Sequence, residues 1–207
     1  MKDIKIIMLV FTCSIILFLC FYFPNKITEM QNTQKKLSDL IGDLQTKNEF
    51  HSINFELNNN LSGIIAPDLF CIGNKIDKKK LSELTVGRKT LIFRHIIDNT
   101  NCNSCNQNEH ELKAFNDAFI ETSDLAIILS SYDSNRDFLL FKKDNDLSIS
   151  IFNIPLEAFD WVAEKNKKSY YFVLHSDMKI SHIYVPNKEF PDLNKQYLEG
   201  VKRFLSE

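Results

Sequence analysis

The sequence of 207 residues has little glycine and proline, five of each, and no surplus of positive charge. The scarcity of glycine and proline excludes a largely disordered chain and favours a compact fold with long elements. Lysine and arginine number 25 against 27 aspartates and glutamates, so the net charge is −2. A nucleic-acid surface needs clustered basic residues, and acidic residues flank both short basic runs, Lys78–Lys80 and Lys165–Lys168. We therefore expect no nucleic-acid partner.

The N-terminus contains one long segment without charge, from Ile6 to Phe23. In a helix, at about 1.5 Å per residue, this segment approaches the ~30 Å thickness of the hydrocarbon core of a bilayer. Lys2 and Lys5 precede it, Tyr22 lies near its far end, and no small-residue cleavage site follows. The pattern predicts that residues 1–24 form an uncleaved single-pass signal anchor in the cytoplasmic (inner) membrane, with the C-terminal domain facing the periplasm or the cell exterior.

A lipoprotein anchor is the alternative for this segment, with Cys13 or Cys20 as the lipidated residue. The residues before them, Thr12 and Leu19, are not the small residues expected at such a site. Without lipidation, both cysteines are apolar residues of a membrane helix.

A polar, helix-prone stretch follows the anchor, and we predict a helical stalk over residues 25–53. One stripe of the stalk is apolar: Leu37, Leu40, Ile41 and Leu44. One or two heptads are too few to establish a coiled coil. Asn58–Asn60 predicts a turn, and residues 54–207 are expected to form the folded domain.

Apolar runs of strand length alternate with helical patterns in this domain. The predicted strands are residues 90–97, 125–130, 149–154, 170–174 and 179–185, and the predicted helices begin at Cys102, Ser134, Pro155 and Pro191. Alternating strands and helices indicate a parallel sheet between helices, and the hairpin formed by the last two strands adds an antiparallel edge. The sequence therefore predicts an α/β fold with a mixed central sheet flanked by helices.

Cys102 and Cys105 are separated by two residues and follow the first predicted strand of this alternation. At the first turn of a helix, such thiols can form one disulfide. The free N–H groups and the dipole at a helix start favour a thiolate on the first sulfur. Lowering a cysteine pKa from about 8.5 to about 7 corresponds to roughly 2 kcal/mol of thiolate stabilisation. The pattern predicts Cys102 as the attacking thiol and Cys105 as the resolving thiol.

Four segments around the cysteine pair carry a family resemblance. They are Ile65–Leu69, Leu81–Leu84, Gly87–Leu91 and the hairpin Tyr171–Ile180. In this order, with the cysteine pair between the third and the fourth, the chain resembles the TlpA/ResA-like, AhpC/TSA-related thiol-disulfide oxidoreductases of the thioredoxin superfamily. The resemblance implies a thioredoxin-like fold and dithiol-disulfide exchange outside the cytoplasmic membrane. It implies an exported protein with a disulfide or dithiol as partner, an unidentified redox donor, and no metal or other cofactor.

Three features depart from the family pattern. Asn101 stands where the family has tryptophan, and the stretch from Phe93 to Cys102 is longer than usual. Ser169 stands at the position of the cis-proline, where the family docks its substrate. A cis bond at a non-proline residue costs about 3 kcal/mol, so we expect a trans bond at Ser169. Since Asn103 and Ser104 are neutral, we expect a reducing or middling potential.

Two other interpretations of the cysteine pair remain open. The first is a structural disulfide in a non-catalytic thioredoxin-like interaction domain, since cysteines outside the cytoplasm oxidise readily. The second is a metal site, for which Cys71, His95 or His110 would have to converge on the pair. Cys71 is expected to be a small buried residue of a strand.

Several other side chains are candidates for supporting roles. His95 and His110 could transfer protons, or could be structural or exposed. Glu109 and Glu111, in the helix of the cysteine pair, are candidates to accept the proton of the resolving thiol, or belong to its solvated surface. Trp161 is expected to pack the third predicted helix against the sheet.

Overall fold

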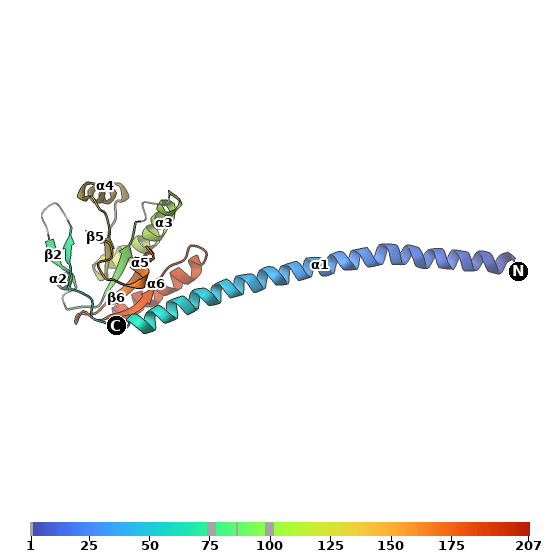
Figure 1. Cartoon of the computed structure of the whole chain (residues 1–207), viewed down its shortest axis with the longest axis horizontal. Helices are drawn as coiled ribbons and strands as arrows, with labels where there is room; N and C mark the ends of the chain where they lie inside the picture. The colour runs from blue at the N-terminus through green and yellow to red at the C-terminus, as the bar shows by residue number, and fades with distance from the viewer. Residues whose placement is uncertain (1, 74–77, 86, 98–101) are drawn as a thin grey trace. The chain divides into compact units, whose positions relative to one another are not determined.

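The computed structural model describes residues 2–73, 78–85, 87–97 and 102–207, and for residues 2–6 and 102–109 it describes the backbone only. The chain divides into two compact units, Met1–Ser52 and Ile53–Glu207. The elements of both units are labelled in Figure 1.

A seven-stranded sheet forms the centre of the second unit, in the strand order β2-β1-β5-β4-β3-β6-β7. The strands are β1 (Phe70–Ile72), β2 (Lys78–Lys80), β3 (Thr90–His95), β4 (Ala126–Ser130), β5 (Ser150–Asn153), β6 (Tyr170–Leu174) and β7 (Ile180–Tyr184). β4 lies parallel to both β3 and β5. The pairs β3–β6, β6–β7, β1–β2 and β1–β5 are antiparallel. The mixed sheet and its terminal hairpin are therefore confirmed.

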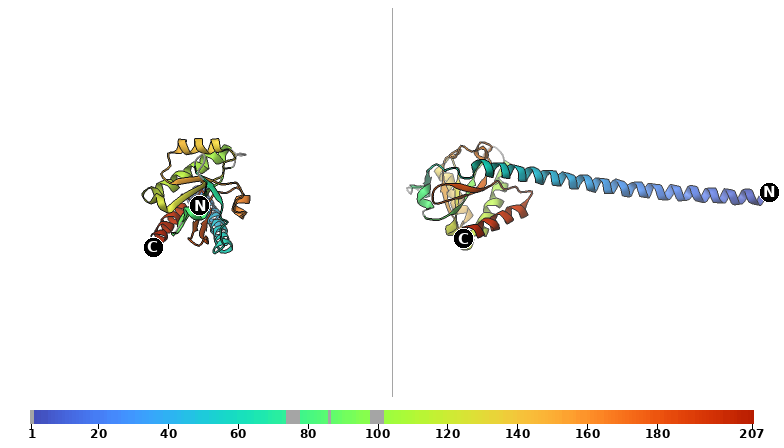
Figure 2. Two further views of the ribbon diagram at one scale, coloured as in Figure 1. Left: turned by 90° about the vertical axis from the view of Figure 1, so that its left-hand side faces the viewer. Right: turned by 90° about the horizontal axis from the view of Figure 1, so that it is seen from below.

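Helices cover both faces of this sheet (Figure 2). They are α2 (Leu81–Leu84), α3 (Cys102–Phe119), the 3-10 segment η1 (Ile120–Leu125), α4 (Asn135–Asn145), α5 (Val162–Lys165) and α6 (Pro191–Ser206). Side chains alternate between the faces along each strand, so Phe93 packs with α3, α4 and α6, whereas Ile92 packs with α2 and α5. The two apolar clusters together form the core of the domain.

The N-terminal helix α1 spans Lys2–Leu61. In the part of the chain that the structure describes, it is the one helix containing a stretch long and apolar enough to cross a membrane, with a mean hydropathy of 2.4. An apolar N-terminal helix is therefore present, as the sequence predicted. Its last residues, from Ile53 onward, belong to the second unit.

The turn predicted at Asn58–Asn60 is wrong, because α1 continues to Leu61. Asparagine is unfavourable inside a helix when its side chain competes for nearby backbone groups. Here the side chains of Asn54 and Asn58 bind β7 and the residue after it instead: the Asn54 Oδ1 accepts a hydrogen bond from the Val185 N–H at 2.7 Å, and the Asn58 Oδ1 accepts one from the Ile183 N–H at 3.2 Å. Because these long-range bonds occupy the side-chain oxygens of the two asparagines, those oxygens do not compete for the backbone groups of the helix.

The segment after α1 continues along the same edge of the sheet. The Gly63 N–H donates to the Ile180 carbonyl at 2.7 Å, the Ile180 N–H donates to the Ile64 carbonyl at 3.0 Å, and the Ala66 N–H donates to the Met178 carbonyl at 2.8 Å. Gly63 adopts a left-handed φ of +83°, which glycine accepts without strain. The chain thus turns from helix to extended backbone at Gly63 and borders β7.

The helix predicted to begin at Pro155 is also wrong, since α5 begins only at Val162. A helix starting at Pro155 would pair the Phe159 N–H with the Pro155 carbonyl. Both groups have other partners: Arg94 Nη2 donates to the Pro155 carbonyl at 2.9 Å, and the Phe159 N–H donates to Glu164 Oε2 at 3.3 Å. Long-range side-chain bonds therefore replace the local helix.

Candidate functional site

The cysteine pair lies in the first turns of α3, which begins at Cys102 as predicted. α3 follows β3, the strand between β4 and β6. Asn101 and the rest of the segment 98–101 lie outside the described residues, as do the side chains of Cys102 and Cys105. The backbone alone puts both cysteines at a helix start, where free N–H groups stabilise a thiolate.

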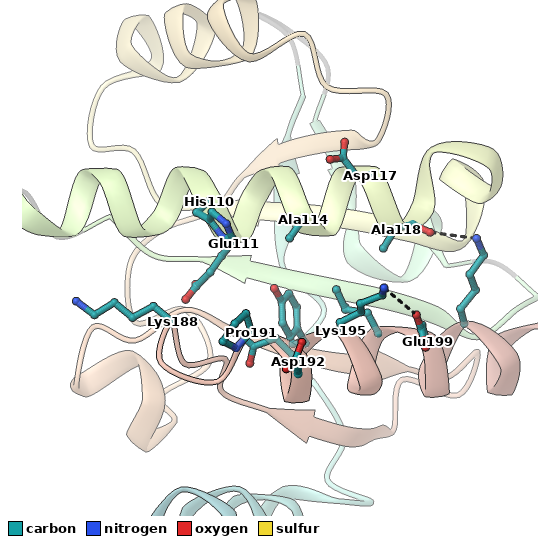
Figure 3. A pocket seen from close by; sticks show the side chains of 14 residues that line it. His110, Glu111, Ala114, Asp117, Ala118, Lys188, Pro191, Asp192, Lys195 and Glu199 are labelled. Atoms are coloured by element: carbon teal, nitrogen blue, oxygen red, sulfur yellow. Dashed lines mark hydrogen bonds and ion pairs between the residues drawn. The ribbon is translucent and has the colours of Figure 1, made fainter. Parts of the chain in front are cut away.

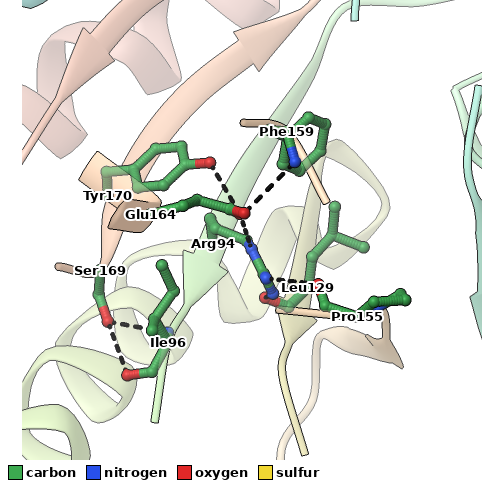
Figure 4. Close-up of polar contacts among 8 residues, drawn as sticks. All are labelled: Arg94, Ile96, Leu129, Pro155, Phe159, Glu164, Ser169 and Tyr170. Carbon is green, nitrogen blue, oxygen red and sulfur yellow. Dashed lines mark hydrogen bonds and ion pairs between the residues drawn. The ribbon is translucent and has the colours of Figure 1, made fainter. Parts of the chain in front are cut away.

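Ser169 precedes β6 directly and is hydrogen-bonded to the residue that follows β3. Its Oγ accepts a bond from the Ile96 N–H at 3.0 Å and donates to the Ile96 carbonyl at 3.4 Å (Figure 4). None of the peptide bonds that the structure describes, the one at Ser169 included, is cis. Ser169 therefore fixes the backbone at the start of the segment that leads to Cys102.

His95 is the last residue of β3 and is only 3% exposed. Its ring stacks on Phe141 of α4, with 5.5 Å between ring centroids. Burial, and secondarily the charge of Arg94, lowers the pKa of His95 to about 4, so the imidazole is neutral at pH 7. Its Nδ1 atom is buried and has no hydrogen-bond partner among the described residues. His95 is thus a core residue on the α3–α4 side of the sheet.

A buried ion pair lies on the opposite side of the same strand. Arg94 Nε and Glu164 Oε1 are 2.5 Å apart, and neither side chain has exposed surface. Arg94 Nη1 donates to the Leu129 carbonyl at 3.2 Å, and the Tyr170 hydroxyl donates to Glu164 Oε1 at 3.2 Å (Figure 4). Burial, followed by the Glu164 charge, holds the pKa of Tyr170 well above its usual range. The pair ties α5 to β3, β4 and β6.

A cleft of about 690 Å³ lies between α3 and α6 (Figure 3). Residues between His110 and Ala118 form the α3 wall, and residues between Pro191 and Lys202 form the α6 wall. Tyr171 of β6 also lines the cleft, and the lining surface is mostly apolar. The volume is in the range of ligand pockets, roughly 300–1,000 Å³.

Glu111 is the one predicted proton acceptor whose side chain the structure describes, because the Glu109 side chain lies outside the description. Figure 3 shows Glu111 reaching from α3 into the space beside α6. Burial raises the pKa of the Glu111 carboxyl from 4.5 to about 7. A carboxyl with this pKa carries or releases a proton near neutral pH.

Cys71 is the middle residue of β1 and is fully buried, as predicted. Burial raises the pKa of the Cys71 thiol to about 12, so at neutral pH this cysteine is a protonated core residue. Its apolar cluster contains Ile92 and Leu129, on the face of the sheet opposite to the ring of His95. Cys71 and His95 therefore do not converge on one metal ion.

Comparison with known proteins identifies similar structures but no similar sequences. No family model and no curated protein matches the sequence. The thioredoxin domain of a thiol-disulfide oxidoreductase from Bacteroides vulgatus superimposes with a TM-score of 0.52 at 13% identity, over 70% of this chain and 97% of that chain. A candidate protein disulfide isomerase from Bacteroides thetaiotaomicron gives 0.52 at 17% identity, over 70% and 91%. The chain has the thioredoxin-like fold.

The thioredoxin-like fold brings some of the predicted residues together and separates others. Ser169 lies beside the backbone that leads to Cys102. Glu111 lines the cleft between α3 and α6, and Cys71 belongs to the apolar cluster on the opposite face of the sheet. Sequence reasoning missed the ion pair of Arg94 and Glu164. One signal was available, because an arginine inside an otherwise apolar strand is buried and requires a partner.

Proposed function

We propose that the chain is a thiol-disulfide oxidoreductase that acts through Cys102 and Cys105. The observation that carries the proposal is the position of the pair at the start of α3, directly after β3, in a thioredoxin-like fold. The descriptions of the two superimposed Bacteroides proteins, an oxidoreductase and a candidate isomerase of disulfides, support the same chemistry.

In the proposed reaction, the Cys102 thiolate attacks one sulfur of a disulfide in an exported protein. A mixed disulfide forms, and the other sulfur of the partner leaves as a thiolate that takes up a proton. The Cys105 thiolate then attacks the Cys102 sulfur, forms the Cys102–Cys105 disulfide and releases the second partner thiol. The partner gains two electrons and two protons, and the cysteine pair loses them. A dithiol donor returns the pair to its reduced form for the next turnover.

The proposal includes a membrane tether formed by the apolar part of α1. That stretch has the length and hydropathy of a membrane span, and lysines precede it at Lys2 and Lys5. The domain then faces away from the cytoplasm, where disulfides persist. Protease added to cells with a permeabilised outer layer is expected to digest the domain, and full protection would contradict this orientation.

Trapping of the mixed disulfide tests the reaction. In Cys105→Ser the resolving thiol is absent, so we expect disulfide-linked adducts of Cys102 with partner proteins that dissociate on reduction. Cys102→Ser is the matched control and is expected to trap nothing. The proposal fails if Cys105→Ser gives no thiol-sensitive adducts and the wild-type pair reacts with hydroxyethyl disulfide no faster than an ordinary exposed thiol.

The second candidate function is that of a non-catalytic interaction domain, in which the cysteine pair forms a structural disulfide. The observation that favours it is Ser169, whose hydroxyl is bound to the Ile96 backbone at the position where the family resemblance expects a substrate-docking proline. In the catalytic case, Ser169→Pro is expected to increase the rate of reduction of a peptide disulfide. In the structural case, Ser169→Pro leaves that rate at the level of an ordinary thiol, and Cys105→Ser traps no adduct.

A further inference from the structure

The cleft between α3 and α6 has no role in the exchange reaction as written. It is large enough for a side chain or a small ligand, and its interior holds a titratable group, Glu111. No described hydrogen bond or ion pair involves the Glu111 carboxyl. A half-buried carboxylate without a cation is unfavourable. A positively charged group in the cleft would therefore stabilise the ionised form of Glu111.

The other charged side chains around the cleft also favour binding of a cation. Lys195 is 3.9 Å from Glu199, and Lys202 Nζ donates to the Ala118 carbonyl at 3.1 Å. Two of the lysines that line the cleft therefore already have partners. In the described part of the chain, the carboxyl of Asp192, which also lines the cleft, takes part in no ion pair, whereas Figure 3 shows the Asp117 carboxyl pointing away from α6. Carboxyls without a cation thus outnumber the remaining lysine of the lining, Lys188.

We propose that this cleft binds a lysine or arginine side chain of the partner polypeptide, with the charged head at Glu111 and the aliphatic stem along the apolar walls. Long basic side chains combine such a stem with a terminal cation, which matches a mostly apolar cleft with one carboxyl inside. This inference rests on the proposed function, because it makes the cleft a specificity site for the protein whose disulfide is exchanged.

The distance along α3 sets where the basic residue stands in the partner. Glu111 follows Cys102 by nine residues, which is about 13 Å along a helix axis and about two and a half turns around it, so the two Cα atoms are about 14 Å apart on opposite sides of the axis. An extended polypeptide covers this distance in roughly four residues. The preferred partner therefore has a lysine or arginine about four residues from its reacting cysteine.

Binding of the basic side chain is expected to depend on pH through Glu111. The groups around this carboxyl are His110 on α3, Tyr171 on β6, Tyr184 on β7, Lys188 just before α6 and Asp192 in the first turn of α6. The pKa values of both tyrosines are raised, chiefly by burial, so these phenols stay neutral. Because the pKa of Glu111 is about 7, the carboxylate forms between pH 6 and pH 8, and the preference for a cation increases over that interval.

Calorimetric titration of the full chain in detergent micelles tests the cleft without any redox step. The probes are two blocked nine-residue peptides with serine in place of cysteine and either lysine or norleucine four positions away. At pH 8 we expect the lysine peptide to bind about tenfold more tightly, since an ionised partner strengthens a hydrogen bond. Glu111→Gln is expected to abolish this preference. Glu121→Gln, which removes an exposed carboxyl outside the cleft, is the control and is expected to keep the preference.

Equal binding of the two peptides by the wild type, or a preference that survives Glu111→Gln, would overturn the inference. Ala114→Phe gives a second test by filling the cleft, and it is expected to weaken binding of both peptides. A parallel assay measures reduction of cysteine-containing versions linked to 2-mercaptoethanol. If the lysine peptide binds preferentially but neither peptide is reduced, the exchange reaction is rejected and the role of the cleft is supported. If both peptides are reduced without a binding preference, the exchange reaction is supported and the role of the cleft is rejected.

Discussion

Arg94 of β3 and Glu164 of α5 form an ion pair in the core, with 2.5 Å between Nε and Oε1 and no exposed surface on either side chain. The guanidinium also donates to the carbonyls of Leu129 and Pro155. Transfer of two charges out of water is offset only when their remaining donors and acceptors are also bonded. The pair is therefore stable as a unit and unstable when either partner is removed.

Glu164→Leu is expected to lower the free energy of unfolding by about 3–5 kcal/mol, because it leaves an unpaired guanidinium in the core. The double variant Arg94→Met with Glu164→Leu is expected to lose much less, since no buried charge remains. Denaturant unfolding of the three proteins measures both effects. A single variant as stable as the double variant would show that the ion pair does not stabilise the fold in this way.

The stability of the domain is expected to fall with rising pH because of Glu111. Its pKa is 4.5 in an unfolded chain and about 7 in the fold, so the folded state binds more protons between these values. Stability from this group is complete below pH 4.5 and is lost as the pH rises through 7. The unfolding free energy of the wild type relative to Glu111→Gln should therefore decrease over this interval. A constant difference would mean that Glu111 is not desolvated.

His95 is expected to have the opposite dependence. Its pKa is 6.5 in an unfolded chain and about 4 in the fold, so the unfolded state binds more protons between these values. Stability from the neutral ring is complete above pH 6.5 and is lost as the pH falls through 4. His95→Phe keeps an aromatic ring beside Phe141 and cannot titrate. The variant should lose less stability than the wild type between pH 6.5 and pH 4, and identical acid curves would contradict the buried neutral imidazole.

Cys71 is expected to resist thiol reagents in the folded protein. Its side chain is fully buried and its thiol pKa is about 12, and the thiolate is the reactive form. In a variant with serine at positions 13, 20, 102 and 105, the remaining Cys71 should react with a disulfide reagent only as fast as the domain unfolds. The same variant in denaturant is the control and should react at once. Rapid reaction under native conditions would place Cys71 at an accessible surface.

Local patterns in the sequence were sufficient for most elements of the fold. Apolar runs predicted β3, β4, β5 and the final hairpin, and Pro191 marked the start of α6. The two errors have long-range causes: Arg94 takes the Pro155 carbonyl, 61 residues away, and Asn58 binds Ile183, 125 residues away. The α3–α6 cleft was not predictable for the same reason, because its walls meet only in the folded chain.

The border formed along β7 by the end of α1 and the segment after it affects how copies of the domain meet. Asn54 and Asn58 are four residues apart, about 6 Å along a helix, and they match alternate residues of a strand, which repeat at about 6.6 Å. Together with the backbone bonds of Gly63–Ala66, they leave little of this edge open to a foreign strand. At the other edge, β2 consists of the exposed lysines Lys78–Lys80, whose like charges repel a second copy. Strand-to-strand polymerisation is therefore disfavoured at both ends of the sheet, even where many copies are crowded together.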